Sequence, residues 1–189
     1  MTINAGLLRQ KFDAALTYED YLETDPERAT PWRELEQRCV LSADQQALLE
    51  RFSRRMPVLC LSGIWCGDCA QQGPLLEIIA RGSDCIDLRW LDRDEHLDLA
   101  EPLRLNAGLR VPMVIFMAED FEPVSVAGDR TLSRYRSLAA RKLGGACPLP
   151  GAAVAEDEVR ATTQEWLDEF ERVHLLLRLS GRLRQKHGD

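Results

Sequence analysis

The stretch that most constrains this chain is WCGDC, residues 65–69, in which two thiols are separated by two residues. An apolar run over residues 57–63 precedes it, and a helical pattern over residues 70–82 follows it. This order predicts a buried strand that turns into a helix, with Cys66 at the start of the helix. Unpaired backbone N–H groups and the positive end of the helix dipole favour a thiolate there, so we expect Cys66 to be the reactive thiol. Cys69 would lie one helical turn on, close enough to attack a mixed disulfide at Cys66.

Composition limits the class of protein. The chain has 189 residues and a formal net charge of −7, from 31 acidic and 24 basic residues. This length suits one domain with additions. The acidic balance argues against a general nucleic-acid binder or a protein held on an anionic membrane. The first twenty residues lack the pattern of a signal peptide, and no apolar stretch reaches the length of a membrane span. We therefore expect a cytoplasmic protein without nucleic-acid or membrane partners.

The cysteine spacing favours redox chemistry over a disulfide framework. The six cysteines lie at irregular intervals: Cys39, Cys60, Cys66, Cys69, Cys85 and Cys147. In a reducing compartment a close pair of thiols is typically catalytic or metal-binding. A structural zinc site needs four ligands, and this chain has one CxxC and three scattered histidines. We expect a redox dithiol and no metal, with two incidental cysteines as the alternative; the other cysteines are expected to be small buried side chains.

Periodicity predicts helices at both ends of the chain and strands between them. Apolar residues recur at helical spacing from Leu7 to Leu16. Pro31, behind Thr30, is predicted to open a second helix. Ser42 with Gln45 forms a capping-box pattern that predicts a third. The other predicted elements are strands over 58–63, 86–92, 111–120 and 122–128, and helices over 132–143 and, as one amphipathic helix, 159–184.

Charged residues outside the motif are expected to have no chemical role. A solvated helix face is expected of four basic residues: Arg134, Arg136, Arg141 and Lys142. The acidic run over 156–158 is expected to mark the start of the last helix, where acidic side chains complement the helix dipole. The apolar stripe of that helix is expected to pack on the central domain or on the N-terminal helices.

The α/β order of elements around WCGDC resembles the thioredoxin superfamily. Pro74 falls five residues after Cys69, where thioredoxins carry the proline that kinks the active-site helix. Pro112 begins a strand after a glycine-containing loop and matches the family's cis-proline. Gly128 follows the last strand, where thioredoxins have a glycine near the substrate groove.

The resemblance covers roughly residues 57–145 and implies a thioredoxin-like fold, in which helices flank a central mixed sheet. Residues 1–56 are expected to form an N-terminal helical extension. Residues 146–158 read as a linker rich in Pro, Gly and Ala, and residues 159–189 as a C-terminal amphipathic helix.

The resemblance also implies roles for the residues around the dithiol. Cys66 and Cys69 are the expected catalytic pair, and Pro74 has a structural role. Trp65, Gly67 and Asp68 are expected to tune the site, with the Trp65 ring packed beside the dithiol as a shield. A cis Val111–Pro112 bond would expose the Val111 backbone to an extended substrate segment near Gly128. An ordinary trans proline at a strand start is the alternative.

Two residues depart from the family pattern. Asp68 stands where thioredoxin has proline, and its charge is expected to raise the pKa of Cys66. Asp68→Pro is then expected to lower that pKa; alternatively, Asp68 simply suits the first turn of a helix. Cys60 stands where thioredoxins usually have a buried aspartate that helps deprotonate the resolving thiol. Either Asp68 or water takes this role, or resolution is slower.

These features together predict a thiol–disulfide oxidoreductase that works as a reductase without an organic cofactor. Its expected substrate is a disulfide-containing protein or a small thiol compound, and an external reductant would regenerate the dithiol. Two alternatives stay open. The chain could be a thioredoxin-like binding scaffold, and a buried and unreactive Cys66 would favour this alternative. It could also be a redox sensor in which Cys66 reacts directly with an oxidant.

Overall fold

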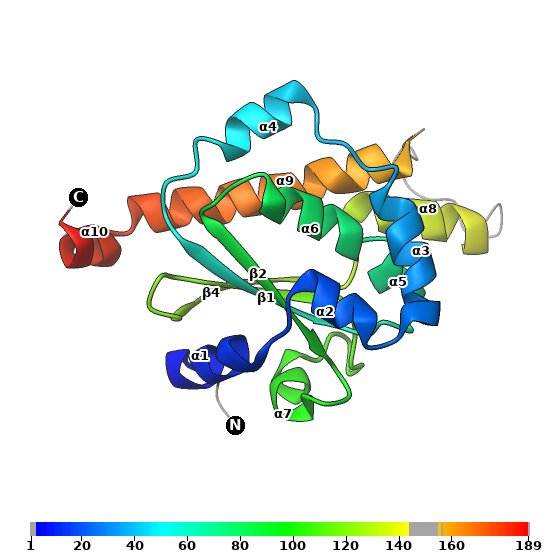
Figure 1. Ribbon diagram of the computed structural model, residues 1–189, viewed down its shortest axis with the longest axis horizontal. Coiled ribbons are helices and arrows are strands. Elements are labelled where there is room, and N and C mark those ends of the chain that lie inside the picture. The colour runs from blue at the N-terminus through cyan, green and yellow to red at the C-terminus, as the bar shows by residue number, and fades with distance from the viewer. Residues whose placement is uncertain (1–2, 144–154, 156, 189) are drawn as a thin grey trace.

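The structure, a computed structural model that describes residues 3–143, 155 and 157–188, is organised around a four-stranded mixed sheet (Figure 1). The strands are β1 (Met56–Ser62), β2 (Ile86–Asp92), β3 (Met113–Met117) and β4 (Pro123–Gly128), in the order β2-β1-β3-β4. β1 is parallel to β2 and antiparallel to β3, and β3 is antiparallel to β4. β1 therefore has a neighbour on each side, which fits the burial of all its residues. The expected α/β fold is confirmed.

Helices cover both faces of the sheet (Figure 1). One face carries α2 (Tyr18–Glu23), α3 (Pro26–Glu36), α6 (Gly73–Arg81) and α9 (Glu158–Leu179), and the other carries α1 (Ala5–Ala14) and α7 (Leu97–Ala100). The remaining elements are α4 (Ala43–Leu49), α5 (Gly67–Ala70), α8 (Leu132–Leu143), α10 (Gly181–His187) and a 3-10 turn, η1 (Glu101–Leu103). Side chains alternate along β1, so Val58 and Cys60 face the first group of helices and Leu59 and Leu61 the second.

The N-terminal helices share one core with the sheet. Trp32 of α3 and Trp90 of β2 pack edge to face with 5.7 Å between ring centroids. Tyr18 and Tyr21 of α2 contact both rings, and all four side chains are buried. Trp32 Nε1 also donates a 3.3 Å hydrogen bond to the carbonyl of Ile64, just before the motif. Residues 1–56 are thus an extension in sequence but are not a separately packed unit.

Two N-terminal helix boundaries differ from those predicted. α1 ends at Ala14, and Leu16 instead bridges to Trp90, so the predicted helical span to Leu16 is too long. α3 begins at Pro26, and the prediction of a helix start at Pro31 is wrong. The Asp25 side chain caps the helix, and Pro26 takes the first-turn position that favours proline.

Two predicted helices are interrupted. The pattern over residues 70–82 divides into α5 and α6, because Pro74 has no N–H with which to continue one helix through the junction. The predicted single helix over 159–184 is α9 followed by α10. Ser180 between them is extended, and its hydroxyl accepts a hydrogen bond from the Leu183 N–H. Ser180 thereby caps a new helix instead of continuing the old one.

Several other predictions are confirmed. The Ser42–Gln45 capping box forms at the start of α4, and the strand over 86–92 and the helix over 132–143 have the predicted bounds. The strand predicted over 111–120 is shorter, since β3 spans only Met113–Met117. Most of the predicted linker over 146–158 lies outside the described residues, and its last residue, Glu158, begins α9.

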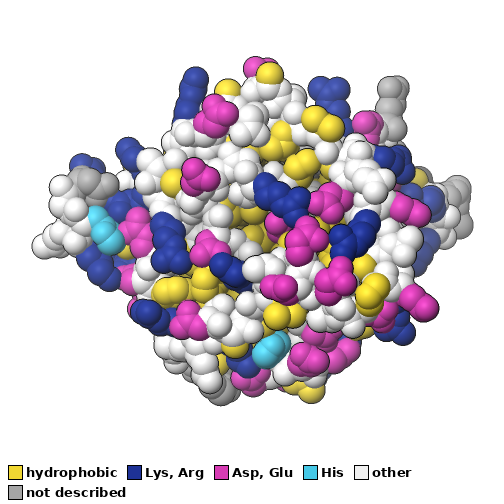
Figure 2. All heavy atoms as spheres, in the orientation of Figure 1, with side chains coloured by type: hydrophobic (Ala, Val, Ile, Leu, Met, Phe, Trp, Pro, Cys, Tyr) yellow, Lys and Arg dark blue, Asp and Glu magenta, His cyan; other side chains and the backbone are white. Residues whose placement is uncertain are grey.

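Figure 2 shows one face of the molecule, on which acidic and basic side chains are intermingled and apolar patches lie between them. No extended surface of one sign is visible on this face. Among the helices of the described ranges, none is long and apolar enough to cross a bilayer.

Trp32→Ala is expected to lower the free energy of unfolding by about 3–5 kcal/mol, the usual cost of truncating a buried aromatic side chain. The variant loses contacts with three other rings and the hydrogen bond to Ile64. Urea unfolding followed by circular dichroism measures the change. Trp65→Ala is the matched control, because Trp65 is 42% exposed and its truncation should cost at most about 1 kcal/mol. Equal losses in the two variants would contradict the core position of Trp32.

Candidate active site

The two cysteines of the motif lie where β1 gives way to α5, as predicted. Cys66 is the N-cap residue of α5 and is half-buried, whereas Cys69 lies inside the helix and is fully buried. Both are free thiols. One sulfur is therefore accessible and the other lies behind it, the arrangement that a nucleophilic and a resolving thiol require.

The two thiols have opposite acidities. A hydrogen bond from the Cys69 thiol lowers the pKa of Cys66 to about 6, against the opposing effect of burial. The backbone N–H groups of Cys69 and Asp68 act in the same direction, as expected at a helix start. Burial, with the same thiol–thiol hydrogen bond, raises the pKa of Cys69. Near neutral pH Cys66 is thus mainly a thiolate and Cys69 holds its proton.

Pro112 faces the dithiol. The Val111–Pro112 peptide bond is cis, as the family resemblance implied. In its protonated form the Cys66 thiol donates a hydrogen bond to the Val111 carbonyl, with 4.0 Å between sulfur and oxygen. Val111 as a whole residue is 6% exposed, and the role of its backbone toward a substrate strand stays a prediction.

Gly128, at the end of β4, packs directly against this proline. Its φ is +148°, and a Cβ at this position would lie 2.4 Å from the Pro112 carbonyl oxygen and 2.8 Å from the Met113 sulfur. Only glycine fits so close an approach. The structure therefore brings Cys66, Val111, Pro112 and Gly128 together, while their roles toward a substrate stay predictions.

Asp68 is held by two arginines that sequence reasoning did not connect with it. Arg130 pairs with one carboxylate oxygen, and Arg134 Nη2 lies 3.1 Å from the other. Burial raises the pKa of Asp68, but the two arginines outweigh it, so the pKa is lowered overall. The Asp68 charge does raise the pKa of Cys66, as predicted, but it is the weakest of the named influences on that thiol.

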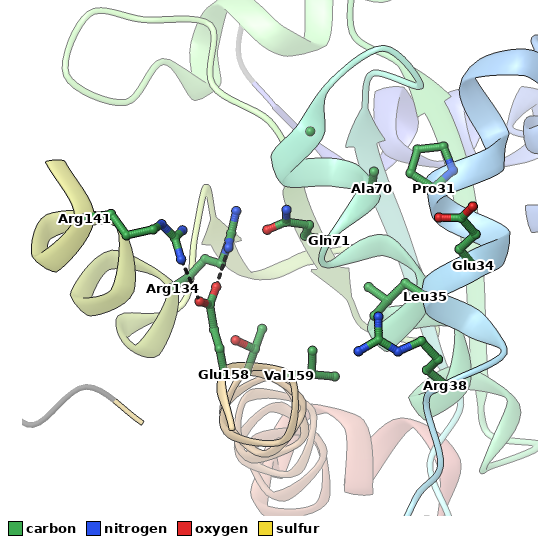
Figure 3. Close-up of a pocket in the computed structure, with 12 residues that line it drawn as sticks. Pro31, Glu34, Leu35, Arg38, Ala70, Gln71, Arg134, Arg141, Glu158 and Val159 are labelled. Carbon is green, nitrogen blue, oxygen red and sulfur yellow. Dashed lines mark hydrogen bonds and ion pairs between the residues drawn. The ribbon is translucent and has the colours of Figure 1, made fainter. Parts of the chain in front are cut away.

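Arg134 is not part of a solvated basic face, so that expectation is wrong for this residue. It is 7% exposed and pairs with Glu158 as well as with Asp68. Arg141 approaches the same glutamate at 3.3 Å, and Figure 3 shows both arginines directed at it. The start of α9 is therefore linked to the motif helix through a buried cation.

Gln72 is a further residue that sequence reasoning missed. It is fully buried between α5 and α6, next to the helix interruption at Pro74. Its Nε2 donates to the carbonyls of Asp129, at 3.0 Å, and Asp68, at 3.3 Å. Its Oε1 accepts a 3.2 Å hydrogen bond from Trp166 Nε1. One amide thus joins the motif helix, the segment after Gly128 and α9.

Trp65 lies at the rim of the site. Its ring stacks on Arg93, with 4.6 Å from the guanidinium carbon to the ring centroid, and occupies the space above Gly63. This contact is a cation–π interaction at a solvent-exposed site. The expected shielding of the dithiol by this ring stays a prediction.

A pocket of about 680 Å³ adjoins the motif (Figure 3). Gly67 and Ala70 of α5 form part of its wall, and Figure 3 shows Arg38, just after the end of α3, and Arg141 of α8 on opposite sides of it. Gly67 has open space where a Cβ would point. The surface next to Cys66 is therefore hollow, and helices from both terminal extensions contribute to it.

Comparisons with known proteins agree with this fold. A family model described as thioredoxin matches residues 15–134, more than half of the chain. The chain belongs to the thioredoxin family. Among solved structures it is similar to a Pseudomonas aeruginosa protein of unknown function, with a TM-score of 0.65, 17% identity and coverage of 91% of this chain and 97% of that one. An HIV epitope scaffold has a TM-score of 0.55 and 18% identity over 89% and 93% of the two chains.

Fasciola hepatica thioredoxin matches 52% of this thioredoxin-family chain and 91% of its own length, at 21% identity and a TM-score of 0.36. The comparison with curated proteins gives no match. Identities this low show the fold and leave the activity to be argued from the site.

Cys60 of this thioredoxin-family chain occupies the position where the resemblance expects a buried acid. It is fully buried, and burial raises its pKa, so it stays a neutral thiol. Cys39 is also buried, Cys85 is half-buried and donates to the Phe52 carbonyl at 3.2 Å, and Cys147 lies outside the described residues. No group of three or more potential metal ligands is arranged to hold an ion within the part of the chain described.

Asp68→Asn is expected to lower the pKa of Cys66, because the change removes a negative charge that opposes the thiolate and leaves Arg130 and Arg134 with one carboxylate fewer to neutralise them. Titration of the thiolate absorbance against pH measures this. Asp13→Asn, on α1 at the other face of the sheet, is the charge-matched control. An unchanged or raised pKa in Asp68→Asn would contradict the prediction.

Asp68→Pro is a less clean test than the sequence suggested. Proline removes the charge, but it also removes the backbone N–H of residue 68 that lowers the pKa of Cys66. The two effects have opposite signs.

Proposed function

We propose that this protein is a thiol–disulfide oxidoreductase that reduces disulfides through the Cys66–Cys69 dithiol. The observation that carries the proposal is the pairing of a half-buried Cys66, whose pKa is lowered to about 6, with a buried, protonated Cys69 one turn along the helix. A vestigial dithiol on a binding scaffold would have no need of an accessible, acidic first thiol.

The reaction proceeds in two exchanges. The Cys66 thiolate attacks one sulfur of a substrate disulfide, forms a mixed disulfide and releases the other substrate sulfur as a thiolate. Cys69 then loses its proton and attacks Cys66 Sγ. A Cys66–Cys69 disulfide forms, and the second substrate sulfur leaves as a thiolate that takes up a proton. Two electrons pass from the dithiol to the substrate.

The substrate in this proposal is a disulfide of a protein or of a small thiol compound, which approaches Cys66 alongside Pro112 and Gly128. An external reductant returns the oxidised pair to the dithiol, since the two cysteines supply only two electrons per cycle. We place the protein in the cytoplasm, where such a reductant is available. No organic cofactor enters the exchange.

The rate of Cys66 alkylation by iodoacetamide is expected to rise with pH and reach a plateau above about pH 7, because only the thiolate reacts. The midpoint should lie near the Cys66 pKa of about 6. Mass spectrometry of the alkylated peptide measures the rate at each pH. Cys66→Ser should remove this phase. A midpoint near about 8.5, the ordinary value for a thiol, would contradict the lowered pKa.

Insulin reduction with a dithiol donor tests the activity itself. Wild-type protein is expected to accelerate insulin precipitation, and Cys66→Ser to reduce the rate to the uncatalysed background, because the first attack needs this sulfur. Cys85→Ser is the control, since this half-buried thiol lies at the far end of the sheet and should leave the rate unchanged. Wild-type activity no greater than that of Cys66→Ser would overturn the proposal.

A further inference from the structure

Three buried hydroxyl groups near the motif, those of Tyr18, Tyr21 and Ser62, have no hydrogen-bond partner among the described residues. Tyr21 is 1% exposed and Ser62 is 0% exposed. A buried polar group without a partner destabilises a fold, because it has lost its hydrogen bonds to water. Phenylalanine and alanine would avoid this cost, so the two of these hydroxyls that neighbour Cys69, those of Ser62 and Tyr21, call for a partner that forms during function.

Ser62 lies between the resolving thiol and Tyr21. It follows Cys60 by two residues on β1, so both side chains project from the same face of the sheet, the face on which Cys69 and Tyr21 are packed. Burial raises the pKa of Cys69, and the neighbouring Ser62 hydroxyl lowers it. Burial likewise raises the pKa of Tyr21, and the same Ser62 hydroxyl lowers it. One hydroxyl is thus adjacent to both groups.

Asp92 extends this group toward the surface. It pairs in register with Ser62 across the parallel strands β1 and β2, so the two side chains lie on the same face, about 4.8 Å apart at the backbone. Its charge also acts on Tyr21. Tyr21 and Asp92 both line a surface pocket of about 470 Å³, together with Asp94, Glu95 and His96.

The resolving thiol needs such a group. Cys69 must lose its proton before it attacks, and it is fully buried with a raised pKa. Cys60, the nearby residue that would be an acid in a thioredoxin, is a neutral thiol. Asp68 is neutralised by Arg130 and Arg134 and is therefore a poor proton acceptor.

We propose that Ser62, Tyr21 and Asp92 form the proton exit of Cys69, leading from the buried thiol to the acidic surface pocket. This inference rests on the proposed function. In the second exchange the Cys69 proton passes to the Ser62 oxygen while the Ser62 proton passes to Tyr21, and the Tyr21 proton passes to Asp92 or to water in the pocket. The Cys69 electron pair forms the bond to Cys66 Sγ, and the substrate thiolate leaves. Both hydroxyls end the step neutral, and the proton lost by Cys69 equals the one delivered to the pocket.

Tyr21 has a natural comparison residue in Tyr18. Both are buried on α2, both rings contact Trp32 and Trp90, and both hydroxyls lack a partner among the described residues. The titratable groups near Tyr18 are Glu19, Glu36, Glu77 and Arg81, whereas those near Tyr21 are Cys60, Cys69 and Asp92. Tyr18→Phe therefore makes the same chemical change outside the proposed exit.

The experiment separates the two exchanges by stopped-flow absorbance. Reduced protein is mixed with one equivalent of 5,5′-dithiobis(2-nitrobenzoate), and release of the coloured thiolate is followed over time. The first release reports attack by Cys66 and the second reports resolution by Cys69. Cys69→Ser identifies the first phase, and Cys66→Ser gives the background from the other thiols.

Ser62→Ala and Tyr21→Phe are expected to leave the first release within about twofold of wild type and to slow the second about tenfold or more, as loss of a hydrogen bond to a charged group predicts. The slowing should shrink at high pH, where hydroxide takes the proton. Tyr18→Phe should match wild type in both phases. Ser62→Ala should unfold at the same urea concentration as wild type or a higher one, because it removes an unsatisfied buried hydroxyl.

Second-phase rates at the wild-type level in both Ser62→Ala and Tyr21→Phe would overturn the inference. Equal slowing in Tyr18→Phe would also overturn it, since a general packing effect would then explain the result. Absence of any Cys66-dependent release in wild-type protein is a separate outcome, which would overturn the proposed function and this inference with it.

Discussion

The ring cluster of Tyr18, Tyr21, Trp32 and Trp90 is the interaction on which the site depends. It fixes α2 and α3 against β2, and Trp32 then reaches two parts of the motif region. Its indole N–H holds the Ile64 carbonyl just before Cys66, and its ring lies where a side chain at Gly73 would otherwise be, 2.0 Å from the Cβ position. Two helices that precede β1 in the chain therefore determine where the active-site turn can lie.

The other terminal extension acts on the opposite side of the motif helix. α9 contributes Trp166 to the Gln72 amide and Glu158 to Arg134, and both of these partners bond in turn to Asp68. A carboxylate next to a nucleophilic thiolate would be unfavourable if it were free. With two arginines on it, Asp68 anchors the helix electrostatically and costs the thiolate little. The acidity of Cys66 is thus a property of the whole packed molecule as much as of the CxxC sequence.

Features that depend on near neighbours in sequence could be predicted. The Ser42–Gln45 cap, the strand over 86–92 and the position of Cys66 at a helix start all follow from local hydrogen bonding and periodicity. Two of the errors had local signals that were outweighed by periodicity: Asp25 before Pro26, and Ser180 before Gly181, are both helix-start patterns.

The partners of Asp68 and Gln72 could not be predicted in this way. Arg130 lies 62 residues from Asp68, and Trp166 lies 94 residues from Gln72. A carboxylate or an amide can pair with many groups, and tertiary packing alone determines which group lies next to it. For the same reason the sequence indicated that the acid at residue 60 is missing but could not indicate Tyr21, which comes from a helix far from Ser62 in the sequence.

Gly67 lies where the chemistry of the thiols and the selection of a substrate depend on different parts of the molecule. Gly67 is the first residue of α5 and directly follows the nucleophile Cys66. A side chain added at Gly67 would nevertheless meet only open space at the edge of the 680 Å³ pocket. The chemistry of the thiols and the selection of what reaches them can therefore change independently, the first through buried contacts and the second through a single exposed position. A lineage built on this fold could diverge in substrate choice by substitutions at residue 67 and along the pocket while its redox centre stayed the same.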